Sequence, residues 1–316
     1  MNKEQGPVVI TGVTGFIGSH LARHFSEQGW STIGIDRTPA SNDLLADLSS
    51  FHCLKLPDPA FGILLKDSSP QLCIHCAGTA SVSQSITDVS ADFYAGTVLT
   101  FEVLNALRLS APRCRLIFLS SAAVYGDPPD LPISEGAPLR PISPYGYHKL
   151  LCEKTAQEFY SIYGVRSCAV RIFSAYGRGL RRQVLWDICQ KALNSDRVEL
   201  LGTGDETRDF VHVQDIAQGI ALIADRAPFQ AEVYNLATGE ETKIRDLAEI
   251  LIAALGRGVE VKFTGTSRAG DPLRWRADIT RLSELGYRPQ TPVAIGAADY
   301  AGWVLENKPS FGERPC

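Results

Sequence analysis

The chain has 316 residues, of which 45% are hydrophobic and 21% are charged, so it can bury a large core in one domain or in two unequal lobes. Its formal net charge of −4 at pH 7 lacks the basic excess that binding to nucleic acid or to an anionic membrane requires. We therefore expect small-molecule partners, with no nucleic acid and no membrane among them.

The first half of the chain alternates short apolar segments with amphipathic ones. The first strand is followed by glycines and by a helix in which Ile17, Leu21 and Phe25 recur every four residues until Gly29 ends it. Strand–helix alternation of this kind predicts a parallel sheet that is covered on both faces. The expected strands are 8–11, 32–36, 51–56, 72–77, 116–120 and 166–173, and the later helices are 61–66, 97–109 and one from 144 through 159 or beyond.

The second half has a different rhythm. Residues 127–144 contain six prolines and are expected to form a loop. Past Tyr176 come loops rich in Gly, Arg and Asp, with helices near 185–193 and 244–255 and short strands near 199–201 and 260–263.

These patterns predict an α/β fold, with a Rossmann-like doubly wound parallel sheet and a smaller, mixed α/β C-terminal substrate lobe. We place the dinucleotide-binding domain at 1–175, with strands near 211–215 and 233–237 returning to it, and the lobe at 176–316.

Targeting signals and cysteines indicate the compartment. The N-terminal residues lead directly into the first strand, without the apolar core and cleavage site of a secretory signal, and no segment reaches the roughly 18 apolar residues of a membrane span. The eight cysteines are scattered, which favours reduced thiols. Cys73 and Cys76 enclose His75, but residues three apart on a strand point to opposite faces. We predict a cytoplasmic protein without a metal site.

A glycine-rich turn, GVTGFIG, joins the first strand to its helix. Gly12, Gly15 and Gly18 permit a tight turn, so that a pyrophosphate can approach backbone N–H groups at the positive end of the helix. Asp36, at the end of the second strand, completes the dinucleotide fingerprint. Its carboxylate would accept hydrogen bonds from a ribose and repel a 2′-phosphate, which favours NAD over NADP. Arg37 beside it works against this preference, and an Asp36 that merely ends a strand at a solvated turn stays an alternative.

Tyr145 and Lys149 occur in the sequence SPYGYHK at the start of an expected helix. Residues four apart lie on one face of a helix, one turn from each other, and a lysine cation there favours the phenolate. Tyr145 is therefore a candidate general acid/base for a sugar or alcohol hydroxyl. His148 is expected to point away from this side, toward the surface.

The chain resembles the extended short-chain dehydrogenase/reductase family, because seven of its segments occur in the family's order and at about its spacing. These segments are GVTGFIG, HCAG, SSAAVYG, SPYGYHK, RIFSAYGRG, GTGDETRDFVHVQD and RAGD. The resemblance is to its NAD-dependent nucleotide-sugar epimerase and dehydratase branch, in the manner of a UDP-glucose 4-epimerase. It implies a nucleotide-diphosphate sugar as substrate, NAD as cofactor, a role in carbohydrate biosynthesis and a homodimer paired through the helices near 97–109 and 144–163.

The resemblance also assigns roles to residues. It makes Ser121 the catalytic hydroxyl and Tyr145 the general acid/base, with Lys149 also holding the nicotinamide ribose; Ser120 is then only the last backbone-facing residue of its strand. The other implied cofactor contacts are Gly12, Gly15, Phe16, Ile17, Gly18, Asp36, Arg37, Ala77, Gly78, Thr79, Ile172 and Phe173. The implied substrate contacts are Ser121, Ser174, Arg208, Arg268 and Asp271.

The arginines suit a diphosphate because guanidinium groups bind such anions in a fork-like manner, although ordinary surface ion pairs stay an alternative. Two family features are replaced here. Ala95 and Gly96 stand where the family often has an asparagine, and the run 55–57 replaces its usual acid, with Asp58 one step later.

Ala122 and Ala123 bear on the type of reaction. By resemblance, Tyr145 removes the proton of the sugar 4-hydroxyl and a transient 4-keto sugar forms. A 4,6-dehydratase usually has acidic residues directly after the catalytic Ser/Thr, whereas two alanines suit a 4-epimerase by leaving room for the pyranose to rotate. We predict a nucleotide-sugar 4-epimerase. The alternatives are a nucleotide-sugar 4-dehydrogenase or reductase, a 4,6-dehydratase, and a non-enzymatic NAD-sensing binding protein.

Overall fold

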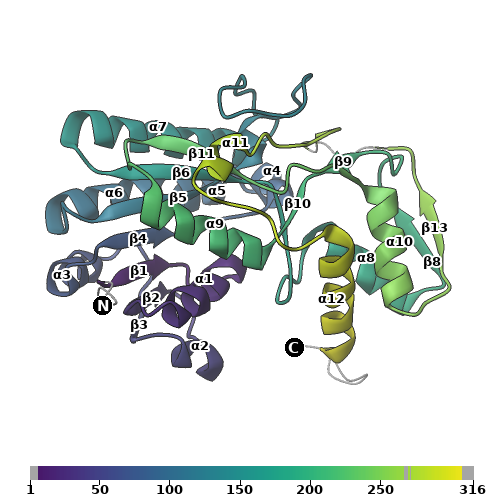
Figure 1. The fold of residues 1–316 in the computed structure, drawn as a ribbon, viewed down its shortest axis with the longest axis horizontal. Coiled ribbons are helices and arrows are strands. Elements are labelled where there is room, and N and C mark those ends of the chain that lie inside the picture. Colours follow the sequence, from purple (N-terminus) through teal and green to yellow (C-terminus); the bar gives the residue numbers. More distant parts are fainter. Residues whose placement is uncertain (1–5, 267–269, 271, 308–316) are drawn as a thin grey trace.

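The computed structural model describes residues 6–266, 270 and 272–307. Its centre is a seven-stranded parallel sheet in the order β11-β6-β5-β4-β1-β2-β3 (Figure 1). This arrangement confirms the expected Rossmann-like fold, in which the strand order reverses between β1 and β4. The strands are β1 (Val8–Thr11), β2 (Thr32–Asp36), β3 (Ser50–Cys53), β4 (Leu72–His75), β5 (Arg115–Ser121), β6 (Ser167–Ile172) and β11 (Glu232–Leu236).

Helices cover both faces of this sheet because alternate strand residues point to opposite sides. Val8 and Ile10 of β1 pack in a core cluster with residues of α1 and α9, whereas Val9 packs in another with α3, α6 and α7. The α-helices of this domain are α1 (Phe16–Glu27), α2 (Asn42–Ala46), α3 (Pro59–Ser68), α4 (Val82–Thr87), α5 (Val89–Phe93), α6 (Leu99–Ser110), α7 (Pro144–Tyr163), α9 (Val213–Arg226) and α11 (Thr280–Glu284).

The second lobe has its own apolar core, formed by three helices and a parallel pair of strands. Figure 1 shows this lobe beside the carboxyl ends of the main strands. Its elements are α8 (Gln183–Asn194), β8 (Arg197–Leu200), α10 (Ile244–Ala254), β13 (Glu260–Phe263) and α12 (Val293–Glu306). Two further ribbons connect the lobes, β7 (Ser174–Tyr176) with β10 (Phe210–His212) and β9 (Thr207–Arg208) with β12 (Thr242–Lys243).

Helices α9 and α12 were not predicted from the sequence, and two predicted elements differ in the structure. The strand expected to return to the sheet near 211–215 is β10, which pairs with β7 outside the main sheet and ends at His212, where His212 caps α9. The helix expected at 97–109 begins as α6 at Leu99, after a π-helix at Tyr94–Val98. No helix in the described residues is long and apolar enough to cross a membrane.

Capping residues set the position of α7. The Ser143 side chain accepts a hydrogen bond from the Gly146 amide at 3.2 Å, and Pro144 occupies the first turn. Gly164 ends the helix in the left-handed conformation. Tyr145 and Lys149 therefore lie in the first two turns, at the end of α7 that approaches β5.

His75 at the end of β4 should make stability depend on pH. It is buried between the hydroxyls of Thr11 and Thr100, and burial together with the Lys149 ammonium lowers its pKa from 6.5 to about 3. The unfolded chain takes up a proton as pH falls through 6.5, whereas folded His75 does not until about pH 3. Its contribution to the free energy of unfolding should therefore fall by about 2 kcal/mol between pH 7 and pH 5.

Urea denaturation of the wild type and of His75→Asn at both pH values measures this loss. The wild type should lose about 2 kcal/mol more than the variant on acidification. Equal losses in the two proteins would show that His75 is protonated in the folded state at pH 5.

Candidate active site at the carboxyl ends of β1, β4 and β5

The GVTGFIG turn is shaped by close backbone contacts. A Cβ on Gly12, whose φ is +69°, would lie 2.6 Å from the Ala77 nitrogen, and one on Gly18 would lie 2.2 Å from the Gly12 oxygen. Gly15 is the N-cap of α1 and provides no side-chain cap. The turn thus lies directly against the segment after β4. At the start of α1, the backbone N–H groups have no side-chain cap and are available to a pyrophosphate.

Asp36 lies beside this turn at the end of β2. One carboxylate oxygen accepts from the Thr14 amide and the other from the Thr38 amide, both at 3.1 Å. Each oxygen keeps a lone pair for a further donor such as a ribose hydroxyl. Arg37 is exposed. Asp58, considered above as a substitute for the family's acid, accepts from the Ala60 amide at 2.8 Å and caps α3.

The predicted reactive residues are placed on two adjacent elements. The Lys149 Nζ lies 5.7 Å from the centroid of the Tyr145 ring and donates to the Leu119 carbonyl of β5 at 2.8 Å. Ser121 ends β5, where its hydroxyl accepts from the Ala123 amide at 3.2 Å and caps a 3₁₀ turn, Ala122–Val124.

Close packing joins these two elements. A Cβ on Gly146 would lie 2.5 Å from the Ala123 oxygen, so α7 packs directly on the turn that follows Ser121. The structure thus brings Ser121, Tyr145 and Lys149 to the end of the sheet at which the glycine turn also lies, with β4 between β1 and β5.

A buried polar network, which the sequence did not reveal, lies beneath this group. Arg171 of β6 makes two hydrogen bonds to the Glu153 carboxylate of α7, at 3.0 and 2.7 Å, and the Ser120 hydroxyl donates to the same carboxylate at 2.6 Å. Arg171 also donates to the Tyr125 hydroxyl, which donates to Asn235 of β11 at 2.6 Å. The expectation that Ser120 has only a backbone role is therefore wrong.

The network keeps Arg171 and Tyr125 protonated. Burial opposes the charge on Arg171, but the hydrogen bonds and charge of Glu153 prevail and raise its pKa. Burial raises the pKa of Tyr125 to about 12, which keeps this phenol protonated as a donor. The signal in the sequence was an arginine in the otherwise apolar segment SCAVRI, with a glutamate four residues after Lys149.

Removing one partner of the Arg171–Glu153 pair should be strongly destabilising. Glu153→Ala leaves a buried guanidinium without its counter-charge and should reduce the free energy of unfolding by about 3–5 kcal/mol. The double variant Glu153→Leu/Arg171→Met, which removes both charges, should lose less than the single variant. Urea denaturation of the three proteins checks this order, and a cost below about 1 kcal/mol for Glu153→Ala would contradict it.

Among the predicted substrate residues other than Ser121, two can be placed. Ser174 is half-buried in β7, and the Arg208 guanidinium lies 5.7 Å from the centroid of the Trp275 ring. Trp275, to which the sequence analysis gave no role, also contacts the ring of Phe173 at 5.8 Å and donates to the Gly126 carbonyl. Arg268 and Asp271 lie outside the described residues.

The remaining predicted cofactor residues lie along the same end of the sheet. Ala77, Gly78 and Thr79 follow β4 directly, and Ile172 and Phe173 are buried at the end of β6. Gly179 approaches the first residue of α1, since a Cβ there would lie 3.9 Å from the Phe16 ring. In the described residues no group of His, Cys, Asp and Glu side chains is placed to hold a metal ion.

Two expectations about this region are wrong. Ala122 is fully buried in a core cluster with Phe173, so its methyl group does not line open space for a pyranose. His148 is buried rather than superficial, and its Nδ1 lies 2.5 Å from the Asp92 carboxylate. It follows Tyr145 by three positions, and such residues are neighbours on one side of a helix.

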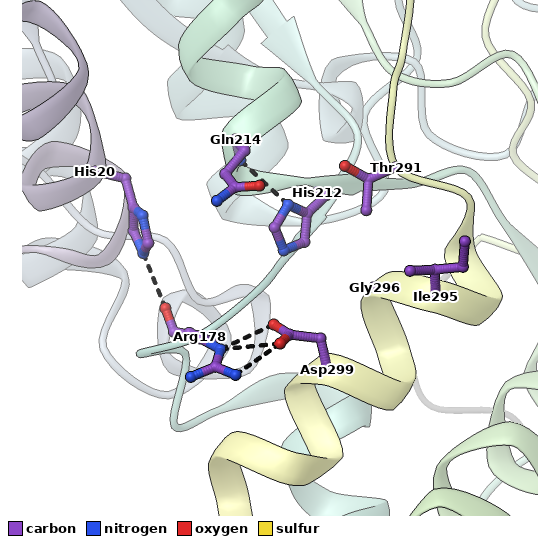
Figure 2. Close-up of a pocket in the computed structure, with 8 residues that line it drawn as sticks. All are labelled: His20, Arg178, His212, Gln214, Thr291, Ile295, Gly296 and Asp299. Atoms are coloured by element: carbon purple, nitrogen blue, oxygen red, sulfur yellow. Dashed lines mark hydrogen bonds and ion pairs between the residues drawn. The ribbon is translucent and has the colours of Figure 1, made fainter. Parts of the chain in front are cut away.

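A cavity of about 310 Å³ lies between α1 and α12, apart from the Tyr–Lys pair (Figure 2). None of Ser121, Tyr145 and Lys149 lines it. Figure 2 shows His20 bonded to the Arg178 carbonyl at 2.9 Å, and the Arg178 guanidinium bonded to Asp299 at 2.7 Å. The hydrogen bond and charge of the Arg178 guanidinium hold the pKa of Asp299 low. Together, the two bonds link the dinucleotide helix to the second lobe. The cavity is lined by His20, Arg178, His212, Gln214, Thr291, Ile295, Gly296 and Asp299.

The fold and this site define a class of nucleotide-dependent α/β enzymes with a Tyr–Lys pair. Comparison with protein families gives a closer assignment, since the model described as "NAD dependent epimerase/dehydratase family" matches residues 8–237. The chain belongs to this family, and NAD is its cofactor. The glycine turn at the start of α1 and the carboxylate of Asp36 fit that cofactor.

Individual relatives cover nearly the whole chain. A UDP-glucose 4-epimerase of Mycolicibacterium smegmatis is 31% identical over 303 residues, which are 92% of this chain and 96% of the relative. A dTDP-glucose 4,6-dehydratase of an Actinoplanes species is 28% identical over 325 residues, covering 95% and 98%. The solved structure of MoeE5 in complex with UDP-glucuronic acid and NAD has a TM-score of 0.87 and 27% identity, covering 95% of this chain and 99% of that one.

Proposed function

We propose that this protein is an NAD-dependent nucleotide-sugar 4-epimerase that acts through a transient 4-keto sugar. The observation that carries the proposal is the placement of Ser121, Tyr145 and Lys149 beside the glycine turn, with Ala122 and Ala123 where a dehydratase would need acids. The similarity to UDP-glucose 4-epimerases supports it. Because Ala122 is buried, the argument from the two alanines depends on their lack of a carboxyl group and not on open space beside them.

Each reactive residue has a role that its surroundings support. Tyr145 is the base that removes the proton of the sugar 4-hydroxyl and returns it after the sugar has turned over. Ser121, at the end of β5, donates to the same oxygen. Lys149 is buried and held by its bond to the Leu119 carbonyl, so its ammonium group stays near the Tyr145 ring. NAD, when bound, accepts the C4 hydride and gives it back.

The remaining site residues are proposed as binding groups. Ser174, Arg208 and Arg268 would bind the diphosphate of the substrate, and Asp271 would accept from the ribose of its nucleotide. The residues after β4 and at the end of β6 would bind NAD. The other candidate functions have weaker support than the 4-epimerase. The similarity to a 4,6-dehydratase favours that reaction, but elimination needs an acid that neither Ala122 nor Ala123 supplies. A 4-dehydrogenase would consume NAD+ and a reductase would consume NADH or NADPH in each turnover, whereas an epimerase has no net consumption of either. An NAD-sensing binding protein would not need the Tyr–Lys pair.

A substrate panel tests the proposed function. UDP-, GDP-, CDP- and dTDP-hexoses are incubated with the protein, and the products are resolved by NMR. We expect C4 epimers of at least one nucleotide sugar, formed without added nicotinamide. A product that has lost water would replace the epimerase with a 4,6-dehydratase. In parallel incubations with added nicotinamide, net formation of NADH from NAD+ would replace it with a 4-dehydrogenase, and net consumption of NADH or NADPH would replace it with a reductase.

Tyr145→Phe should lower kcat by about 10²–10⁴ while NAD still binds, because only the phenolic acid/base is removed. Steady-state kinetics together with NAD titration checks this. Tyr163→Phe removes an exposed phenol from the far end of the same helix and is the matched control. Near-normal turnover by Tyr145→Phe would contradict the assigned role.

We further propose a homodimer that pairs α6 and α7 with the same helices of a second copy. These helices pack side by side (Figure 1), and six large apolar side chains on them are at least 43% exposed. Burying such a surface in a second copy would be favourable. The side chains are Phe101, Leu109, Tyr147, Leu151, Ile162 and Tyr163. The cytoplasmic location stays a prediction from the sequence.

Light scattering after size-exclusion chromatography tests the dimer. The wild type should elute with twice the chain mass of 34.4 kDa, and Leu151→Glu should elute as a monomer because a carboxylate would be buried in the interface. Leu201→Glu, at an exposed position of the other lobe, should keep the mass of the wild type. A monomeric wild type at micromolar concentration would exclude this interface.

A further inference from the structure

A second polar cluster lies beside Tyr145 and has no part in the proposed acid/base group. It joins Thr79, after β4, to Asp92 of α5 and His148 of α7. The Thr79 hydroxyl donates to one oxygen of the Asp92 carboxylate, and the His148 Nδ1 lies 2.5 Å from the other. Asp92 is 3% exposed and His148 is 9% exposed. The cluster therefore connects the loop after β4 to the helix that carries Tyr145 and Lys149.

The chemistry of the carboxylate assigns the protons of this cluster. An ionised carboxylate only accepts hydrogen bonds, so the His148 Nδ1 must carry a proton. The Thr79 hydroxyl has a single proton, and this proton is directed at Asp92. The Thr79 oxygen consequently offers only lone pairs to any other group, which makes it an acceptor.

Packing holds Asp92 and His148 in this arrangement. Asp88 caps α5 by accepting from the Ala91 amide at 2.9 Å, and the ring of Phe93 contacts the His148 ring edge-on at 5.3 Å. The π-helix that follows α5 brings the Thr97 hydroxyl to the His148 carbonyl at 3.4 Å. The segment that carries Asp92 is thus fixed against α7 rather than free to move with the loop after β4.

Thr79 lies where a dinucleotide must pass. The glycine turn contacts Ala77, two residues before Thr79, since a Cβ on Gly12 would meet the Ala77 backbone. On the other side, His148 follows Tyr145 by three residues on α7. A dinucleotide that extends from the glycine turn to Tyr145 passes this loop, and its ribose hydroxyls are hydrogen-bond donors that suit an acceptor there.

We propose that Asp92 and His148 are positioning residues that orient the Thr79 hydroxyl as an acceptor for a ribose hydroxyl of NAD. They thereby couple the loop after β4 to the catalytic helix. The inference depends on NAD as the cofactor and on no particular sugar reaction. A failure of the epimerase assignment would therefore leave it intact, and binding of NAD is the quantity that tests it.

A double-mutant cycle of Thr79→Val and Asp92→Asn, read by calorimetric titration with NAD, is the test. Thr79→Val removes the acceptor and Asp92→Asn releases its orientation, so each should raise the Kd for NAD by roughly fivefold to tenfold. The double variant should bind no more weakly than Thr79→Val, because Asp92 acts through Thr79. Thr79→Ser should recover most of the affinity. Multiplying effects, or an unchanged Kd in Asp92→Asn, would overturn the proposal.

Control variants separate positioning from a general loss of stability. Asp88→Asn makes the same exchange at the exposed cap of α5, where asparagine also caps, and should leave the Kd for NAD unchanged. His148→Asn keeps an N–H for Asp92, whereas His148→Leu does not. The asparagine variant should bind NAD more tightly than the leucine variant, and this pair decides the question if Asp92→Asn does not fold. Equal weakening in both would assign His148 a packing role only.

Discussion

The buried ion pair between Arg171 and Glu153 is the interaction on which the arrangement of this site depends. Arg171 belongs to the sheet and Glu153 to α7, so their two hydrogen bonds fix the position of the helix over β5 and β6. Burying two charges is costly unless their remaining hydrogen-bonding capacity is met. Here Ser120 and Tyr125 meet it, and both are neighbours of the turn that carries Ser121.

Close backbone contact is the second constraint. Gly12 lets the dinucleotide turn lie against the segment after β4, and Gly18 lets α1 begin directly against the backbone of that turn. Gly146 lets α7 lie against the turn after β5. In each case a side chain would separate two elements by the width of a methyl group or more. The glycine turn, which is the proposed NAD site, and the Tyr–Lys pair thus lie at one end of the sheet, and the cluster of Thr79, Asp92 and His148 joins the loop after β4 to α7.

The parts that the sequence predicted correctly depend on local patterns. The parallel sheet followed from strand–helix alternation, and the glycine turn and the Tyr–Lys pair were visible as motifs whose spacing has a direct geometric meaning. Helix α9 was missed although Ile216, Ile220 and Ile223 recur at helical spacing, because its first residues were assigned to a strand near 211–215.

The parts that were missed depend on contacts between distant segments. Arg171 pairs with a residue 18 positions away, and Tyr125 with one 110 positions away. No periodicity reveals such partners. The error at His148 was geometric, since a residue three positions after Tyr145 lies on the same side of the helix. Its partner Asp92 is 56 positions away, so the burial of the pair could be recognised only in the fold.

The return of the same hydride to C4 is the central chemical claim, and isotopic labelling tests it most directly. A nucleotide sugar that carries deuterium at C4 is converted in ordinary water, and the unlabelled sugar is converted in deuterated water. The account predicts that the epimer keeps its C4 deuterium in the first experiment and gains no carbon-bound deuterium in the second. Loss of the C4 label, or deuterium at C5 with loss of water, would contradict it.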